Sequence, residues 1–159
     1  MIERKPSDSD VIMAEVMQPN HANPSGNVHG GEIMKMLDNA AGAVAFRHAR
    51  SNCVTVSVQD IFFKEPVYVG NLVQTYARLL YVGKSSMLVG VKMYVEDMLM
   101  GERREAIRAF FTMVALDKAN KTKEVPRILI DNDKDRDNFE IGKAKYQESK
   151  SRLIGDWLL

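Results

Sequence analysis

The strongest constraint on the fold is a segment that is apolar on almost every side of a predicted helix. Residues 32–47 read EIMKMLDNAAGAVAFR, and apolar residues recur at helical spacing in two series, one from Ile33 and one from Met34. Glu32 in the first turn and Arg47 in the last turn complement the helix dipole. A helix of this composition should be largely buried, so the rest of the chain must cover it.

The sequence after this helix alternates with a period of two, which is typical of β-strands. An earlier short apolar run, before the helix, indicates a first strand. One buried helix followed by a series of long strands predicts an α+β fold, in which a curved antiparallel sheet covers the helix. The predicted strands are residues 11–17, 53–58, 72–82, 87–96 and 104–116.

The two ends of the chain differ from this central part. Residues 1–9 are polar, and we expect a flexible N-terminal tail there, followed by a domain over residues 10–118. Residues 119–159 form a charged extension, which we expect to be partly helical. Within it, residues 131–137 are almost wholly charged and are expected to be solvated, whereas residues 139–153 predict an amphipathic helix that ends in an apolar Trp-Leu-Leu.

Composition limits the classes of function. The 159 residues suit one domain, and 22 Lys and Arg against 21 Asp and Glu give a net charge of +1, which predicts no nucleic-acid or membrane partner. No apolar run approaches the ~20 residues of a membrane span, and the N-terminus lacks a secretory apolar region. With one cysteine and three scattered histidines, the sequence predicts no disulfide, no metal site and a cytoplasmic location.

Residues 21–42, HANPSGNVHGGEIMKMLDNAAG, closely resemble the cytosolic acyl-CoA hydrolase family of hotdog thioesterases. The matching elements are Asn23, Gly26, the Val-His-Gly-Gly step at 28–31, and Asp38, eight residues after Gly30. The segments FKEP at 63–66 and VGKSSM at 82–87 also look like that family, and the resemblance covers residues 10–118.

The resemblance implies a hotdog fold and an enzyme that hydrolyses acyl-CoA. It implies no cofactor, because coenzyme A is part of the substrate and the product. It further implies active sites at a dimer interface, with Asn23 and Gly31 from one chain and Asp38 from the other. Dimers of this family would assemble into a hexamer, as a trimer of dimers.

The same residues have a chemical reading of their own. Free N–H groups at a helix N-terminus can polarise a thioester carbonyl, and Gly30 and Gly31 have no side chains to block a ligand from them. Asp38 can act as a general base on water or attack directly as a nucleophile. Asn23, on the preceding loop, can orient the water or the thioester.

One distance argues against a site within a single chain. Gly30 and Asp38 are eight positions apart, which on a helix is about 12 Å. One thioester group cannot contact both. Two antiparallel copies of the helix would bring each helix start to the other copy's Asp38, and the small residues Ala41, Gly42 and Ala45 would allow that approach.

The phosphates of coenzyme A require cationic or N–H donors. Lys84, Ser85 and Ser86 lie in a predicted exposed loop between two strands and are candidates for this contact, although such a loop is more often only a hairpin.

Other readings of individual residues compete with the catalytic ones. His29, beside the helix start, is expected to make a structural hydrogen bond rather than to act as a base, and His48 is expected at the surface. Cys53 is expected in the core rather than as a nucleophile. Two further functions stay open: a hotdog dehydratase acting on acyl thioesters, and a non-catalytic acyl-CoA-binding or assembly module. A dehydratase would need a catalytic histidine, whereas Asp38 occupies the helix here.

Overall fold

The computed structural model of the chain describes residues 2–151. Two long helices and four long strands dominate it, and shorter elements lie toward both ends. In chain order the elements are β1 (Glu3–Arg4), η1 (Pro6–Ser9), β2 (Val11–Val16), η2 (Pro19–His21), α1 (Gly30–Ala49), β3 (Asn52–Phe63), β4 (Leu72–Val82), β5 (Ser86–Asp97), β6 (Glu102–Leu116), β7 (Arg127–Ile128) and α2 (Asp133–Ser151).

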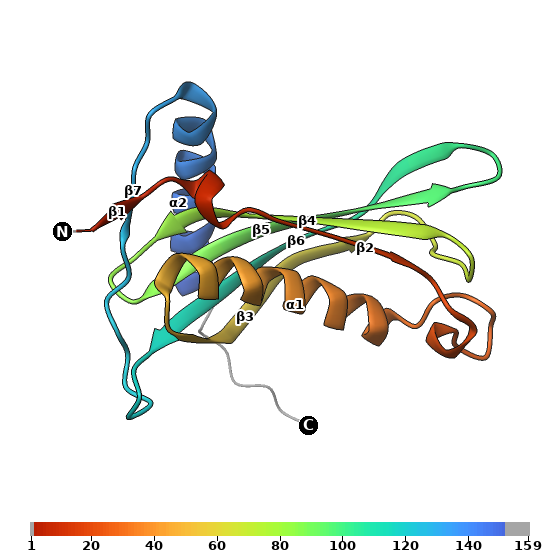
Figure 1. Cartoon of the computed structure of the whole chain (residues 1–159), viewed down its shortest axis with the longest axis horizontal. Helices are drawn as coiled ribbons and strands as arrows, with labels where there is room; N and C mark the ends of the chain where they lie inside the picture. The colour runs from red at the N-terminus through yellow and green to blue at the C-terminus, as the bar shows by residue number, and fades with distance from the viewer. Residues whose placement is uncertain (1, 152–159) are drawn as a thin grey trace.

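The main sheet has five antiparallel strands in the order β2-β4-β5-β6-β3. Helix α1 lies along one face of this sheet and contacts all five strands, and α2 crosses the other face at one end (Figure 1). The predicted α+β architecture, with one long helix covered by an antiparallel sheet, is confirmed.

The core lies between α1 and the sheet. Leu37, Ala40 and Val44 of α1 are fully buried, and they pack with strand residues such as Met93 and Phe111. Strand side chains alternate between the two faces of a sheet, so every second strand residue enters this core. Burial of apolar surface at this single interface is what holds α1 in place.

Two of the small residues expected to face a second helix lie elsewhere. Ala41 and Ala45 are fully buried against the sheet. The exposed side of α1 carries Asp38 and Phe46, and Gly42 lies beside it with open space where a Cβ would stand. The helix is therefore covered on most sides but keeps one face open.

Strand β3 is longer and less regular than the sequence predicted. It extends to Phe63, and its pairing with β6 shifts register twice, between Thr55 and Ser57 and between Gln59 and Phe62. Asp60 within the second shift has a positive φ of 54°. β-Bulges of this kind insert extra residues into one strand, which breaks the period-two pattern used to find it.

The N-terminal segment that we expected to be a flexible tail forms ordered structure. β1 pairs in parallel with β7, and Lys5 forms an ion pair of 2.5 Å with Asp131. Pro6 and Ser9 of η1 are buried. These contacts could not be predicted from the local sequence, because their partners, β7 and Asp131, lie toward the other end of the chain.

The charged extension is more integrated than its composition suggested. Helix α2 begins at Asp133, six residues before the predicted start. Residues 131–137 are exposed as expected, except Asp135 in the first turn of α2, which is 6% exposed. Asp135 and Asp10 flank the guanidinium of Arg78, so one arginine joins β4, α2 and the segment before β2. The predicted helix residues 152–153 and the apolar end at 157–159 lie outside the described residues. Neither described helix could span a membrane.

His48 is buried, not at the surface as expected. The ring is 1% exposed, and its Nε2 donates to the carbonyl oxygen of Pro126 at 2.8 Å. Nδ1 has no hydrogen-bond partner among the described residues. Burial lowers the pKa of His48 below its ordinary value, and the bond to Pro126 only partly opposes this shift.

Replacing His48 with Gln should weaken the pH dependence of stability. The native state favours the neutral ring, so below the unfolded pKa of about 6.5 the unfolded chain binds more protons and the free energy of unfolding falls. One such group contributes at most about 1.4 kcal/mol per pH unit. Urea denaturation between pH 5 and pH 7.5 measures this slope. An equal slope in wild type and in His48→Gln would contradict the assignment.

Candidate active site

The start of α1 is fixed by a side-chain cap. His29 precedes the helix, and its Nδ1 accepts a hydrogen bond of 2.9 Å from the N–H of Gly31. The backbone N–H of His29 in turn donates to His21 at 2.7 Å, which closes the loop between them. The expected structural hydrogen bond of His29 is confirmed, and it occupies one of the two glycine N–H groups considered for a ligand.

A hollow of 330 Å³ lies beside this helix start. Asn23 and Gly30 both line it, together with residues of β3 and of the loop that follows β3. The N–H of Gly30 has no partner among the described residues and remains available as a donor, as expected at a helix N-terminus. Asn23 Oδ1 accepts from the N–H of Ser25 at 3.0 Å, so the loop holds this side chain in place. The structure therefore brings two of the predicted site residues together.

Asp38 lies elsewhere, on the exposed face of α1. Its Oδ1 accepts a hydrogen bond of 2.6 Å from the hydroxyl of Thr55 on β3. The same hydroxyl is 3.3 Å from the sulfur of Met113. Thr55 therefore fixes one oxygen of the carboxylate and leaves the other without a partner among the described residues.

Sequence reasoning did not single out Thr55. It lies within a run of β-branched residues, Val-Thr-Val at 54–56, where threonine is an ordinary strand former. Only the packing of β3 beside the middle of α1 makes its hydroxyl a partner of Asp38, and no local pattern records that packing.

One chain does not assemble a complete site. The hollow at Asn23 does not include Asp38, in agreement with the separation of about 12 Å along the helix. Exposed apolar side chains occur on the two elements that carry Asp38 and Thr55: Phe46 of α1 is 45% exposed, and Val56 on the edge strand β3 is 56% exposed. Exposed apolar surface beside a polar group is typical of an interface.

The β4–β5 turn with Lys84, Ser85 and Ser86 lines neither of the hollows described in the chain. Lys84 is exposed and lies 3.4 Å from Glu124. The hydroxyl of Ser86 is buried and forms a hydrogen bond of 2.6 Å with Tyr146 of α2. The Ser86 hydroxyl is therefore already engaged, whereas the exposed Lys84 can meet a ligand.

Other chemistries find little support in the described residues. Burial raises the pKa of the Cys53 thiol to about 11, so the nucleophilic thiolate is scarce at neutral pH, and its expected place in the core is confirmed. Across residues 2–151, no three His, Cys, Asp or Glu side chains cluster in a way that could hold a metal ion. The reactive groups that remain are a positioned carboxylate and a free helix N-terminus.

Comparison with known proteins supplies the context of these groups. Residues 25–101 match the protein family described as Thioesterase superfamily. The chain is 31% identical over 151 residues to the mouse cytosolic acyl coenzyme A thioester hydrolase, covering 94% of this chain but only 40% of that protein. It is 40% identical over 111 residues to a Zymomonas mobilis acyl-CoA thioester hydrolase described as uncharacterized, covering 70% of this chain and 74% of that protein.

Solved structures agree with this similarity. An apo-hexameric acyl-CoA thioesterase has a TM-score of 0.89 at 27% identity, covering 97% of this chain and 100% of the other. The Staphylococcus aureus acyl-CoA hydrolase, in complex with butyryl coenzyme A and coenzyme A, has a TM-score of 0.87 at 27% identity, covering 94% and 92%.

Replacing His29 separates its structural role from a catalytic one. His29→Ala removes the cap on Gly31 and should lower the free energy of unfolding by about 1 kcal/mol. His29→Asn keeps an acceptor at the cap and should restore most of that loss. Urea denaturation of the two variants, with Ser25→Ala as a control at an exposed position of the same loop, measures the difference. Equal losses for Ala and Asn would show that the cap is not what His29 contributes.

Proposed function

The chain belongs to the thioesterase superfamily, and on this premise we propose that it hydrolyses acyl-CoA thioesters to a free fatty acid and coenzyme A. The observation that carries the proposal is the carboxylate of Asp38, held by Thr55 on the exposed face of the helix whose start offers a free N–H. The chain spans 40% of the length of its mouse, rat and human relatives, so the proposal concerns this domain.

The reaction needs a polarised carbonyl and an attacking oxygen. The N–H of Gly30 polarises the thioester carbonyl, and the bare backbone of Gly31 lets the substrate approach. Asp38 either removes a proton from water, which then attacks the carbonyl carbon, or attacks that carbon itself. The C–S bond breaks, and the thiol of coenzyme A leaves with a proton. Asn23 orients the water or the thioester.

A second copy of the chain supplies the missing half of each site. Asn23 and Gly30 of one chain would then face Asp38 and Thr55 of the other. The separation within one chain, the open face of α1 and the uncovered apolar residues on β3 support this arrangement. Relatives described as hexameric support a further assembly of dimers into a hexamer.

Variants of a relative support the choice of residues. Structures of the Staphylococcus aureus enzyme include alanine variants of an asparagine, an aspartate and a threonine, at positions separated by 15 and then 17 residues. Asn23, Asp38 and Thr55 are separated by the same intervals.

The remaining parts of the proposal concern the nucleotide, the cofactor and the location. Lys84, with Ser85 and Ser86 beside it, contacts the phosphates of coenzyme A. No cofactor is needed, since coenzyme A enters with the substrate and leaves as product. The name of the mammalian relatives, cytosolic, supports a cytoplasmic location. The capping role of His29 argues against a dehydratase, which needs a catalytic histidine.

Asp38→Asn should lower kcat by about 10²- to 10⁴-fold, because it removes the general base, and by more if Asp38 is the nucleophile. Thiol release from acyl-CoA, followed colorimetrically in a folded variant, measures the loss. Glu32→Gln is the matched control, since Glu32 is a carboxylate on the same helix that pairs only with Lys35 in the described chain. A kcat near that of wild type in Asp38→Asn would reject Asp38, whereas no thiol release by wild type would favour the binding module.

Thr55→Val should lower kcat about tenfold with little change in KM, because the hydroxyl positions the carboxylate and a hydrogen bond to a charged group is lost. Ser57→Ala, two residues along the same strand, is the control and should act like wild type. A change in KM alone would mean that Thr55 binds substrate instead of positioning Asp38.

Mixed dimers test the shared site. Asp38→Ala and Asn23→Ala chains, each nearly inactive, are unfolded together and refolded as a mixture. Half of the random dimers are then mixed, and each mixed dimer has one intact site, so about one quarter of wild-type activity should return through the regained positioning of groups. Verified mixed dimers without activity would place both residues in one chain's site.

A further inference from the structure

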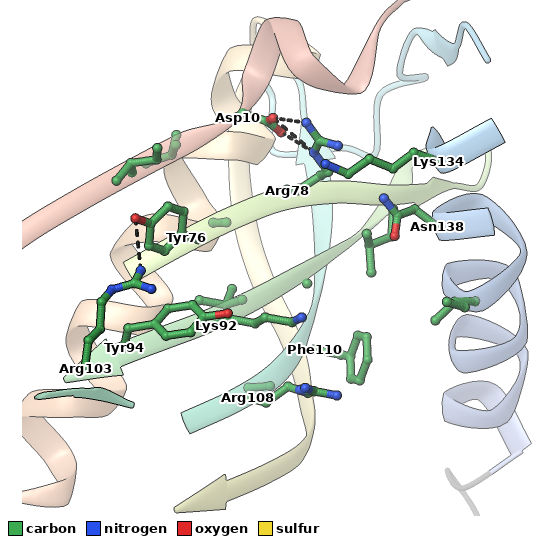
Figure 2. A pocket seen from close by; sticks show the side chains of 18 residues that line it. Asp10, Tyr76, Arg78, Lys92, Tyr94, Arg103, Arg108, Phe110, Lys134 and Asn138 are labelled. Atoms are coloured by element: carbon green, nitrogen blue, oxygen red, sulfur yellow. Dashed lines mark hydrogen bonds and ion pairs between the residues drawn. The ribbon is translucent and has the colours of Figure 1, made fainter. Parts of the chain in front are cut away.

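The larger hollow of the molecule lies away from the candidate active site. It encloses 580 Å³ on the face of the sheet opposite α1, over β4, β5 and β6 and beside α2 (Figure 2). Strand side chains alternate between faces, so its charged lining comes from strand positions that face away from α1, although the core residues Ala77, Val91 and Ala109 also border it. It shares no lining residue with the hollow at Asn23. We call it the outer groove.

Cationic side chains are concentrated in the outer groove. Lys92 on β5 and Arg108 on β6 are direct cross-strand partners, and Figure 2 shows both side chains extending toward Phe110. Arg103 lies nearby, with its guanidinium 4.0 Å from the centre of the Tyr94 ring. Like charges directly opposite each other on neighbouring strands are destabilising, and Glu105, which binds Arg108 through both carboxylate oxygens, reduces this repulsion.

Carboxylates balance only part of this charge. Glu105 binds both Arg108 and Lys64, and Asp10 binds Arg78. Within residues 2–151, Lys92 and Arg103 have no carboxylate partner. The surplus is local, because the whole chain has a net charge of only +1.

The rest of the outer groove is apolar. Leu80 is folded over Gly90, where an added Cβ would lie 2.8 Å from Leu80 Cδ1. Ile141 of α2 is 53% exposed and Ile12 of β2 is 65% exposed, so apolar surface borders the groove on both sides. A small inorganic anion would satisfy the cations and leave this apolar surface in water.

We propose that the outer groove binds an amphiphilic monocarboxylate, with its headgroup between Lys92 and Arg108 and its hydrocarbon chain against Phe110, Leu80 and Ile141. The ammonium of Lys92 has no carboxylate partner among the described residues and can pair with a carboxylate, and an alkyl chain gains free energy by covering the exposed apolar side chains. Arg103 lies farther along the groove, on the other side of the Tyr94 ring, and its guanidinium already donates to Gln74 and to the hydroxyl of Tyr76, so it does not hold the headgroup.

A free fatty acid is the source of such a ligand if the proposed function holds, since hydrolysis releases one. The site itself is a binding site and takes no part in hydrolysis. Lys92, the groove residue that the test changes, does not line the hollow at Asn23, so it can be changed without altering that hollow.

The test is calorimetric titration of the full-length protein with dodecanoate below its micelle concentration. Wild type should bind one more dodecanoate per chain than Lys92→Glu, in which a carboxylate faces the headgroup. Lys92→Met, which removes only the charge, should weaken this site about tenfold. Lys118→Glu is the control, an exposed lysine outside the groove, and should bind like wild type. Raising the ionic strength should weaken the groove site.

Ligand series decide the chemistry of the site. Dodecanol lacks the charge and acetate lacks the chain, so neither should fill the groove. Equal binding of dodecanoate to wild type and to Lys92→Glu overturns the proposal. Binding of dodecanol as tight as that of dodecanoate also overturns it, as does a neighbouring copy of the chain that already fills the groove. If inorganic phosphate binds the groove as tightly as dodecanoate and displaces it, the proposal is also overturned, because the apolar surface would then contribute nothing to binding.

Thiol release, measured separately, distinguishes failure of this proposal from failure of the proposed function. Thiol release by Lys92→Glu at low product concentration should equal that of wild type. If wild type binds the extra dodecanoate but releases no thiol, the groove stands and the hydrolase proposal falls. If thiol is released without Lys92-dependent binding, the hydrolase proposal stands and the groove falls.

Discussion

Burial of α1 against all five strands is the interaction on which the rest of the structure depends. The helix is apolar on most sides, and only a sheet that covers it can remove that surface from water. This requirement fixes the position of every site residue on the helix. Asp38 reaches solvent because it lies on the one face that the sheet does not cover, and Gly30 offers its N–H because the helix begins beyond the covered region.

The same requirement explains why the N–H of Gly30 and the carboxylate of Asp38 do not meet within one chain. A rigid helix holds its N-terminus and its middle at a fixed separation, and no loop movement can bring Gly30 to Asp38 within a single copy. A symmetric partner would remove this limit, since its antiparallel helix would bring a second Asp38 to the Gly30 N–H of the first chain. Association would then have a catalytic purpose in addition to covering Phe46 and Val56.

Much of the fold could be predicted because its signals are local and periodic. The spacing in α1 and the alternation in β4 and β5 mark elements whose observed bounds differ from the predicted ones by two residues or fewer. Asn23, Gly30, Gly31 and Asp38 could be named from one contiguous segment. Contacts between distant segments could not be predicted in this way. The burial of His48 depends on Pro126, the role of Thr55 on the packing of β3, and the hydrogen bond of Ser86 on Tyr146.

The alternation of β5 has a consequence for how this protein can change over time. Val91 and Met93 belong to the core with α1, while Lys92 between them belongs to the outer groove. Substitutions at every second position of β5 therefore change one face of the sheet and leave the other intact, so the two faces can diverge independently. Deletion of a single residue early in β5 would instead turn every following side chain to the opposite face of the sheet. Lys92 would then point toward the buried helix, and its apolar neighbours would be exposed. The fold therefore tolerates a change of residue type in this strand better than a change in the length of the strand.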